Sequence, residues 1–351
     1  MIRFADDTPI DPSIVERMTA ALGHRGPDAQ RVESVDPHAH LGFCRLAILD
    51  LDPRAMQPMH SADARYTLVF NGEIYNYREL RAELPDYPFR TTGDSEVILA
   101  AFARFGEAAI DRLNGMFAIA IYDRVERSLL LARDRTGQKP LYVAGLRLRD
   151  GSLERTADPI VFASELRSLA LAGIDTQLDL PTIATYLSLG YVPSGERIGD
   201  AMKLPPGAVV RVDACGATMR FIDTPPPPVD DRPIVERVRS LVEQAVSRQL
   251  VSDVPLGCFL SGGIDSSIIA LCMTRAIGDA KRVRTFSIGF DDPLYDETAH
   301  AAEVARHLGT THQQFTVTPD AAIDLPTLAC AYGEPFADSS ALPTHYLARE
   351  T

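Results

Sequence analysis

The sequence predicts two domains of different fold class, an α+β domain followed by an α/β domain built on a parallel sheet. The chain has 351 residues, which is long enough for two hydrophobic cores. A run of four prolines at 225–228, directly after Thr224, interrupts it, and consecutive prolines cannot donate backbone hydrogen bonds to a helix or a sheet. Short strands separated by turns dominate before this run, whereas strands and helices alternate after it.

The first region, residues 1–222, is predicted to be mainly antiparallel β structure with helices laid on the sheets. Apolar residues at helical spacing predict a helix over 95–105 with Asp94 as its N-cap, and an earlier helix that begins at Asp11 and ends at Gly23. Short apolar runs bounded by turn residues predict the strands, at 41–50, 66–70, 116–122, 128–132 and 141–143.

The second region, residues 230–351, follows a proline-rich linker at 223–229 and alternates between the two kinds of element. This order is typical of a doubly wound sheet of parallel strands. The predicted helices are 233–250, 268–277 and 297–308, and the predicted strands are 254–260, 283–290 and 313–317.

Composition excludes several classes of protein. The chain carries 35 Lys and Arg against 48 Asp and Glu, a formal charge of −13, and it has no basic run that could follow a nucleic-acid backbone. Its five cysteines are scattered, which predicts neither a disulfide framework nor a zinc site. No apolar run approaches the roughly 18 residues of a membrane helix, so we expect a cytoplasmic protein without a membrane partner.

A glycine- and serine-rich segment at 256–267 passes from an apolar strand into a helix, the place where parallel sheets bind ligands. Its glycines let the backbone approach an anion, and the helix N-terminus and serine hydroxyls supply donors. Asp265 would repel a bare phosphate, so it is predicted to bind Mg²⁺. The alternative is an ordinary turn capped by Asp265, but the full Ser-Gly-Gly-x-Asp-Ser string favours a phosphate site.

This string resembles the pyrophosphate-binding loop of the ATP-pyrophosphatase (PP-loop) superfamily. Further motifs narrow the resemblance to the glutamine-hydrolysing asparagine synthetases. They are HRGPD at 24–28, RLAILD at 45–50, FNGEIYNY at 70–77, ARDRTGQKPLY at 132–142, FASE at 162–165, TFSIG at 285–289 and FADSS at 336–340. The motifs occur in the family order, so the resemblance spans the whole chain.

The resemblance implies a class II glutaminase domain with the αββα sandwich of N-terminal-nucleophile hydrolases, followed by part of a PP-loop ATP-pyrophosphatase domain. Family members hydrolyse glutamine and convert aspartate to an aspartyl-adenylate, which ammonia then attacks. The expected partners are therefore glutamine, ATP and aspartate or another carboxylate, with ATP and Mg²⁺ as cofactors.

Five residues of the first region match the family's glutaminase site. By resemblance, Arg45 binds the α-carboxylate of glutamine, while Glu73 and Asp94 bind its amino end. Asn71 and the Gly72 N–H hold the oxyanion of the tetrahedral intermediate. Taken singly, Asn71-Gly72 could be a hairpin turn, Asp94 a plain N-cap and Arg45 a surface strand residue. Their joint occurrence in family order favours the functional interpretation.

The resemblance also implies the nucleotide site of the second region, where Leu260 and Ile288 contact adenine and ribose. Both could otherwise be core residues of strands. The complete set expected to bind ATP is Leu260, Ser261, Gly262, Gly263, Asp265, Ser266 and Ile288.

The chain departs from the family pattern at both ends. The family's nucleophile is a cysteine directly after the initiator methionine, in Met-Cys-Gly-Ile-Ala-Gly, whereas this chain begins Met1-Ile2-Arg3-Phe4. We therefore expect that about six residues, including the nucleophile, are missing. Cys44 has no α-amino group to activate it. The family also continues into a second acidic glycine-rich motif beyond the position of Thr351. These departures predict an impaired enzyme.

The sequence is also compatible with two alternatives. The protein could resemble the β-lactam synthetases, which lack glutaminase chemistry and close an intramolecular amide, or it could be a non-catalytic remnant that only binds a ligand. The intact set of glutamine-site residues argues against the first. The acceptor and any homo-oligomerisation are left open by the sequence.

Overall fold

The computed structural model describes residues 1–4, 8–226, 229–290, 296–318 and 321–351, without the side chains of 321–323. The chain forms two compact units. The N-terminal unit comprises Met1–Pro225 and Gly333–Pro335, and the C-terminal unit comprises Pro226–Tyr332 and Phe336–Thr351. The division falls within the proline run, of which Pro227 and Pro228 lie outside the described residues.

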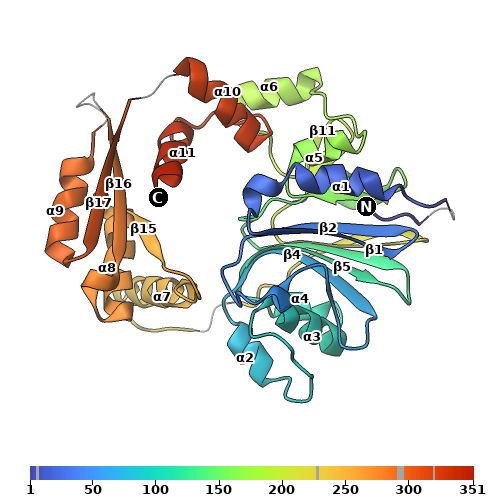
Figure 1. Ribbon diagram of the computed structural model, residues 1–351, viewed down its shortest axis with the longest axis horizontal. Coiled ribbons are helices and arrows are strands. Elements are labelled where there is room, and N and C mark those ends of the chain that lie inside the picture. The colour runs from blue at the N-terminus through green and yellow to red at the C-terminus, as the bar shows by residue number, and fades with distance from the viewer. Residues whose placement is uncertain (5–7, 227–228, 291–295, 319–320) are drawn as a thin grey trace. The chain divides into compact units, whose positions relative to one another are not determined.

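The N-terminal unit consists of four layers, two of strands between two of helices (Figure 1). One layer is an antiparallel sheet in the order β14-β13-β6-β5-β4-β3. Its strands are β3 (Met59–His60), β4 (Tyr66–Ile74), β5 (Gly115–Asp123), β6 (Ser128–Arg133), β13 (Ala208–Asp213) and β14 (Gly216–Phe221). The second layer contains the pair β1 (Ala29–Asp36) and β2 (Ala39–Arg45) and the antiparallel sheet of β10 (Val161–Ala163), β7 (Tyr142–Ala144), β12 (Ala201–Lys203) and β11 (Arg197–Ile198). The hairpin of β8 (Leu146–Arg149) and β9 (Ser152–Arg155) extends from it.

Helices cover the outer faces of both strand layers. α1 (Pro12–Ala20) and α5 (Leu166–Leu171) pack on β1, β2 and β10, while α3 (Ser95–Phe105) packs on β4. The remaining helices of this unit are α2 (Tyr77–Ala82), α4 (Ala108–Asp111) and α6 (Leu180–Leu189). The layer order is therefore αββα, as the family resemblance implies.

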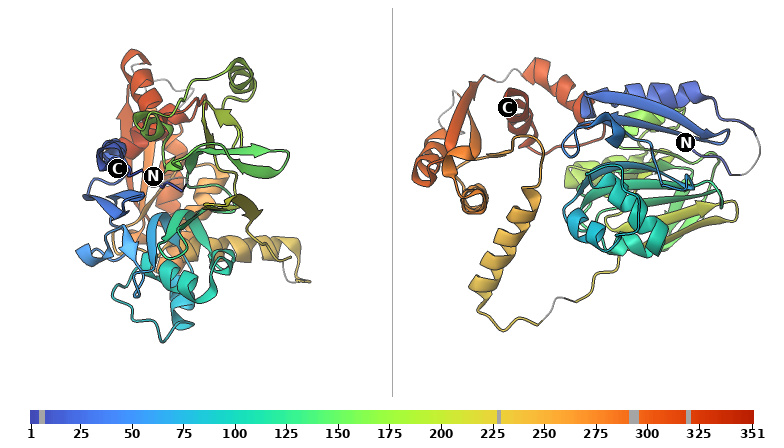
Figure 2. Two further views of the ribbon diagram at one scale, coloured as in Figure 1. Left: turned by 90° about the vertical axis from the view of Figure 1, so that its right-hand side faces the viewer. Right: turned by 60° about the horizontal axis from the view of Figure 1, so that its bottom comes forward.

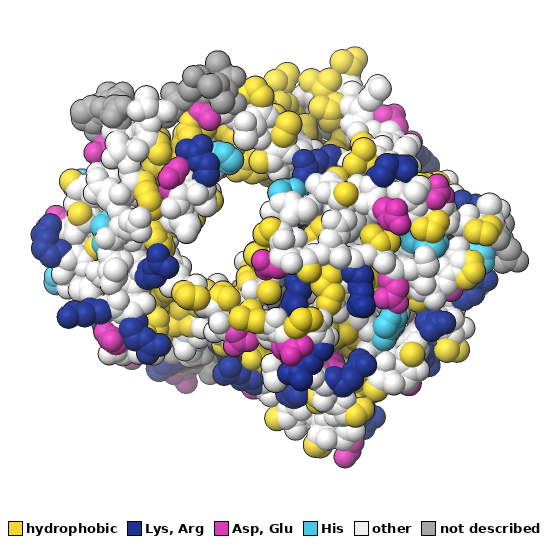
Figure 3. All heavy atoms as spheres, viewed as in Figure 1, with side chains coloured by type: hydrophobic (Ala, Val, Ile, Leu, Met, Phe, Trp, Pro, Cys, Tyr) yellow, Lys and Arg dark blue, Asp and Glu magenta, His cyan; other side chains and the backbone are white. Residues whose placement is uncertain are grey.

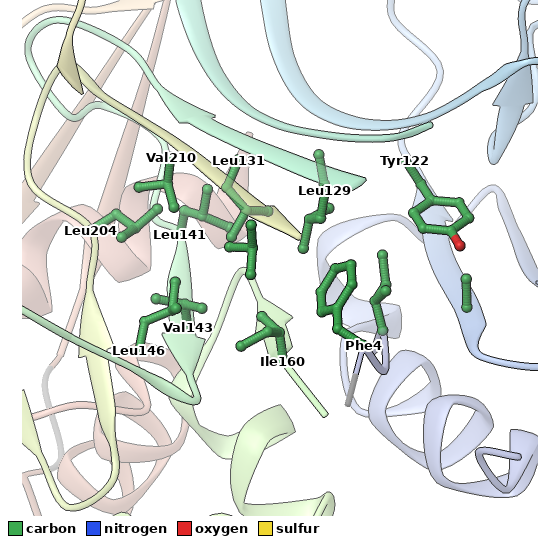
Figure 4. Close-up of a cluster of buried hydrophobic side chains, with 14 of the residues drawn as sticks. Phe4, Tyr122, Leu129, Leu131, Leu141, Val143, Leu146, Ile160, Leu204 and Val210 are labelled. Carbon is green, nitrogen blue, oxygen red and sulfur yellow. The ribbon is translucent and has the colours of Figure 1, made fainter. Parts of the chain in front are cut away.

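The hydrophobic core of the N-terminal unit lies between the strand layers. Figure 4 shows Leu129 and Leu131 of β6 directed toward Val143 and Ile160, with Phe4 and Tyr122 at one end of the cluster. A second core lies between α1, α5 and the strands beneath them. Because β7 and β10 are covered on both faces, these two strands lack the alternation of apolar and polar residues that marks a half-exposed sheet.

Most predicted elements of this unit are confirmed, with shifted ends. α3 has the predicted bounds, and β4 runs four residues past the predicted strand 66–70. α1 stops at Ala20, because the chain then enters a 3₁₀ turn at Gly23–Arg25. The predicted strand 41–50 is wrong beyond Arg45, because the chain turns there and Asp50 has a φ of 50°.

The C-terminal unit contains a parallel sheet in the order β15-β16-β17, which confirms the predicted α/β class. The strands are β15 (Gly257–Phe259), β16 (Arg284–Phe290) and β17 (Thr311–Val317), and the helices are α7 (Ile234–Gln249), α8 (Ile264–Ile277), α9 (Thr298–Leu308), α10 (Ala321–Tyr332) and α11 (Ala341–Glu350). Figure 2 shows α7 as a straight helix, and its residues Val242 and Val246 pack with Met273 of α8. α8 begins four residues earlier than predicted, because Gly263 serves as its N-cap.

The surface of the N-terminal unit carries both signs of charge. On the face drawn in Figure 3, basic and acidic side chains are interspersed. Within the described part of the chain, no helix has the length and apolar character needed to cross a membrane.

Candidate functional site

The N-terminal unit contains a pocket of about 460 Å³, and all five predicted glutaminase residues line it. Arg45 ends β2, Asp94 precedes α3, and the other three are consecutive residues of β4. The structure therefore brings together, in one pocket, side chains separated by up to about 50 positions in the sequence.

The backbone of β4 presents an unpaired amide to this pocket. Gly72 lies opposite Phe117 of β5, but the N–H and C=O of Phe117 both bond to Asp134 on the far side, at 3.1 and 2.9 Å. Gly72 and Phe117 therefore form a non-hydrogen-bonded pair of the antiparallel ladder, in which both residues direct their backbone groups outward, so Gly72 directs its N–H away from β5. No described residue accepts a hydrogen bond from it. The hairpin-turn alternative for Asn71-Gly72 is wrong, because both residues lie inside a paired strand.

Glycine is required at position 72 because of the close approach of β5. A Cβ atom there would lie 2.0 Å from the Met116 carbonyl oxygen, far inside van der Waals contact. The small residue thus allows the two strands to pair while the amide of position 72 faces the pocket.

The side chain of Asn71 supplies a second free donor. Its Nδ2 atom is buried and has no hydrogen-bond partner among the described residues. Buried amide nitrogens are nearly always bonded, and an orphaned one at a pocket wall indicates a place for a ligand acceptor. Asn71 and Gly72 are adjacent in β4, so they can donate to one oxygen atom of a ligand.

Two carboxylates give the pocket an acidic side. Asp94 is 5% exposed, and burial raises its pKa to about 6, although its bond to the Ile74 amide opposes that change. Burial also raises the pKa of Glu73, against the attraction of Lys139. For both carboxylates, the desolvation that burial causes outweighs the stabilisation of the charged form by the present partners, so both pKa values are raised. A ligand ammonium group would supply additional donors.

Arg45 is buried rather than exposed on a surface strand. It is 8% exposed, and its two terminal nitrogens donate to the carbonyl oxygens of Asp52 and Asp50, at 3.0 and 2.5 Å. A guanidinium has five N–H donors, so these two bonds fix its orientation and leave others for a ligand carboxylate.

Further pocket residues had no role assigned from the sequence. His24, Arg25 and Lys139 lie within the quoted family motifs, which is the signal that could have identified them. Burial and the nearby Arg25 lower the pKa of Lys139. Gln57 and Cys44 also line the pocket, and no motif marked Gln57.

Cys44 is the thiol of this pocket, and it is held protonated. Its Sγ donates to the Thr19 carbonyl oxygen at 3.2 Å, and burial raises its pKa. A thiol must lose its proton to act as a nucleophile. The environment of Cys44 therefore works against that role, as expected from its position within the chain.

The glycine-serine loop of the C-terminal unit lies between β15 and α8, at the carboxyl end of a parallel strand. Gly262 has a φ of 83°, and a Cβ atom there would lie 2.6 Å from the Ala301 nitrogen of α9. The serine hydroxyls bond within the loop: Ser261 Oγ lies 3.0 Å from Ser266 Oγ, and Ser267 Oγ donates to the Gly263 carbonyl at 2.7 Å. These bonds hold the loop in one conformation directly before the N-terminus of α8, where free backbone N–H groups favour an anion.

A pocket of about 740 Å³ adjoins this loop, and four of the predicted ATP-binding residues line it: Leu260, Ser261, Ser266 and Ile288. Its other walls include the aromatic rings of Phe259 and Phe290. Ile288 is half-buried, whereas Leu260 is 1% exposed and also packs in a core with Ala270. Gly262, Gly263 and Asp265 belong to the loop but do not line the pocket.

Asp265 lies exposed in the first turn of α8. Within the described residues, no group of three His, Cys, Asp or Glu side chains could hold a metal ion. One carboxylate beside a helix N-terminus can share a Mg²⁺ ion with phosphate oxygens, but it forms no metal site by itself. The Mg²⁺ role of Asp265 remains a prediction.

Two family models match the chain. Residues 2–221 match the glutamine amidotransferase domain, and residues 237–351 match asparagine synthase. The asparagine synthetase (glutamine-hydrolyzing) 1 of Bacillus subtilis is 34% identical over 345 residues, which cover 96% of this chain and 52% of that protein. The asparagine synthetase (glutamine-hydrolyzing) 2 of Arabidopsis thaliana is 32% identical, over 91% of this chain and 50% of its own length.

The chain thus spans about half the length of these curated relatives. Among solved structures, the glutamine phosphoribosylpyrophosphate amidotransferase of B. subtilis, complexed with ADP and GMP, matches with a TM-score of 0.45 and 15% identity. That match covers 90% of this chain and 80% of the other.

Proposed function

Because this chain belongs to the glutamine-hydrolysing asparagine synthetase family, we propose that it serves ATP-dependent amide synthesis in which glutamine supplies the nitrogen. The observation that carries this proposal is the pair of unpaired donors, Asn71 Nδ2 and the Gly72 N–H, in a pocket that also contains a fixed guanidinium and two carboxylates. A free amino acid with an amide side chain has complementary groups.

We propose one orientation for glutamine in this pocket. Its α-carboxylate would bind the free N–H groups of Arg45, and its α-ammonium would bind Asp94 and Glu73. The side-chain carbonyl oxygen would then accept hydrogen bonds from Asn71 and Gly72. These bonds strengthen when a nucleophile adds to the carbonyl carbon and the oxygen becomes negative, so they favour the tetrahedral intermediate over the bound substrate.

The second half of the reaction belongs to the C-terminal unit. We propose that the loop at 260–266 binds ATP phosphates through its backbone N–H groups, and that the apolar pocket beside it holds the base. A carboxylate oxygen of the acceptor would attack the α-phosphorus, pyrophosphate would leave, and ammonia would then displace AMP from the acyl carbon. Mg²⁺ bound through Asp265 would offset phosphate charge.

Aspartate is the proposed acceptor, with another carboxylate as the alternative. We expect the polypeptide Met1–Thr351 to bind glutamine but to hydrolyse it slowly, because Cys44, a thiol that lines the pocket, is held protonated. Binding and turnover must therefore be measured separately.

The first test is calorimetric titration of this polypeptide with L-glutamine and, separately, with ATP and Mg²⁺. The matched variants are Glu73→Gln in the pocket and Glu79→Gln, an exposed acid of α2. L-glutamine should bind the protein and the Glu79 variant alike, and the Glu73 variant about tenfold more weakly, as expected for loss of a charged hydrogen bond. Absence of glutamine binding would overturn the proposal and favour a protein of the β-lactam-synthetase type.

Pyrophosphate release from ATP, measured with glutamine or ammonia and with or without aspartate, tests the second half. Stimulation by aspartate supports aspartate as the acceptor. Ligand binding without any product would support the non-catalytic alternative for this polypeptide.

A further inference from the structure

A side-chain amide completes the edge of β4 beside the proposed oxyanion site. The short strand β3 pairs with β4 only at Thr67 and Leu68. Beyond that point the outward amides of β4 belong to Phe70, Gly72 and Ile74, because alternate residues face the same edge. Two of these three amides have side-chain partners, and the middle one has no partner among the described residues.

Gln57 binds both backbone groups of Phe70. The Phe70 N–H donates to Gln57 Oε1 at 2.6 Å, and Gln57 Nε2 donates to the Phe70 carbonyl at 3.3 Å. The side chain is 4% exposed, so these bonds form away from bulk water. One planar amide thus replaces the peptide group that a neighbouring strand would have supplied.

Through Ser95, the Gln57 side chain is also linked to Asp94, which binds β4 two residues beyond Gly72, at Ile74. Gln57 Nε2 lies 3.4 Å from Ser95 Oγ, which lies 3.4 Å from Asp94 Oδ1. Asp94 Oδ2 in turn accepts from the Ile74 N–H at 2.9 Å. The backbone is therefore held two residues before and two residues after Gly72, and the Gly72 amide between them stays free.

We propose that Gln57 is a positioning residue for the oxyanion site: by holding Phe70, it directs the Asn71 side chain and the Gly72 N–H to one point in the pocket. This inference rests on the proposed glutamine function. The amide of glutamine supplies one donor and one acceptor in a plane, which match the two backbone groups of Phe70. Glutamate would keep the acceptor for the Phe70 N–H, lose the donor to its carbonyl and add a charge near Asp94.

A purely structural role for Gln57 makes a different prediction. If Gln57 only closes the edge of the sheet, its loss should lower stability and weaken all pocket ligands equally. If it positions the donors, its loss should weaken ligands that place a negative oxygen at Asn71 and Gly72 more than ligands that do not.

The affinities for two free amino acids, used as ligands, distinguish the positioning role from the structural role. L-glutamate places a carboxylate oxygen at the proposed site, whereas L-norvaline has the same α-ammonium, α-carboxylate and carbon count but ends in a methyl group. The variants are Gln57→Met, which keeps the length of the side chain, and Gln30→Met, a control at an exposed glutamine of β1. All are measured by calorimetric titration of the full chain.

We expect Gln57→Met to bind L-glutamate about tenfold more weakly while the affinity for L-norvaline changes less than about twofold. The Gln30 variant should match the parent protein for both. Equal weakening of both ligands, or no weakening of either, overturns the positioning role. If Gln57→Met does not fold, Ser95→Ala removes the link between Gln57 and Asp94 and should show the same selectivity with a smaller loss.

The outcome also separates this inference from the function on which it rests. If the parent protein binds neither L-glutamine nor L-glutamate, the proposed function fails and the positioning role fails with it. If both bind and Gln57→Met shows no selectivity, only the positioning role is overturned.

Discussion

The side chain of Asp94 occupies the N-cap position of α3 without making a side-chain capping bond, and it accepts from the Ile74 N–H of β4 at 2.9 Å and from Ser95 Oγ at 3.4 Å. An N-cap aspartate normally accepts from a backbone N–H of the first turn. Here the carboxylate is turned to the pocket wall instead. The negative charge of Asp94 therefore lies at the pocket, and α3 lacks the stabilisation that a side-chain cap would provide.

This arrangement predicts that Asp94→Asn stabilises the N-terminal unit above about pH 6. Burial raises the pKa of Asp94 from 3.8 to about 6, so the folded state binds more protons than the unfolded state between these values. Stability therefore falls as pH rises through this window and stays low above it. Two pKa units correspond to about 3 kcal/mol, and an asparagine oxygen can still accept from Ile74.

Hydrogen exchange followed by mass spectrometry can measure this effect for each unit separately. The N-terminal unit of the Asp94 variant should be more protected by about 2–3 kcal/mol near pH 7.5, and the difference should vanish near pH 4. The C-terminal unit serves as the internal control. A variant less stable than the parent at neutral pH would contradict the raised pKa.

A second prediction concerns the pH dependence of glutamine binding. The carboxylate of Asp94 must be ionised to attract an ammonium group, and its raised pKa places the loss of that charge near pH 6. We expect the affinity for L-glutamine to be constant from about pH 8 to 7 and to fall below pH 6 by up to about tenfold per pH unit. In Asp94→Asn, binding should be weak at every pH. A flat profile in the parent protein would exclude Asp94 as the ammonium ligand.

Most helices and strands could be predicted from the sequence, and the five residues predicted for the glutamine site line one pocket, but their hydrogen-bond partners could not be predicted. α3 has its predicted bounds because its apolar positions repeat at helical spacing. The end of β2 at Arg45 was missed, because it depends on carbonyl groups that lie five and seven residues further along. Such bonds follow from tertiary structure rather than from local pattern.

Gln57 illustrates the same limit at the site itself. Its neighbours show no periodicity, and its role depends on where β3 stops along the edge of β4. The residues Asn71 and Gly72 could be selected from the sequence through the family motif. That the amide of Gly72 is free could be seen only from the pairing of Phe117 with Asp134.

A third prediction compares two adjacent glycines of the nucleotide loop. Gly262 has a φ of 83° and no room for a Cβ atom, whereas Gly263 has a φ of −68°, and its nearest contact would be the Ser261 hydroxyl at 3.3 Å. Gly262→Ala should destabilise the C-terminal unit by about 1–3 kcal/mol through backbone strain and the clash with α9. Gly263→Ala should change stability by less than about 1 kcal/mol.

Urea unfolding read by hydrogen exchange of the C-terminal unit would measure both changes. ATP titration of the same variants adds a second reading, because Gly262→Ala should also weaken ATP binding by distorting the loop. Equal stability of the two variants would mean that the loop relaxes freely around position 262, which is inconsistent with its packing on Ala301.

The last prediction concerns the reactivity of Cys44. Its thiol donates to Thr19 and its pKa is raised by burial, whereas Cys215 is exposed. Alkylation by iodoacetamide requires the thiolate, so Cys44 should react at least about tenfold more slowly than Cys215 near pH 8. Mass spectrometry of peptides containing each cysteine measures both rates in one sample. Cys44→Ser should bind L-glutamine like the parent protein, because the thiol is not needed to hold the ligand. Rapid alkylation of Cys44, blocked by L-glutamine, would instead identify an ionised thiol in the pocket and reopen its role as the nucleophile.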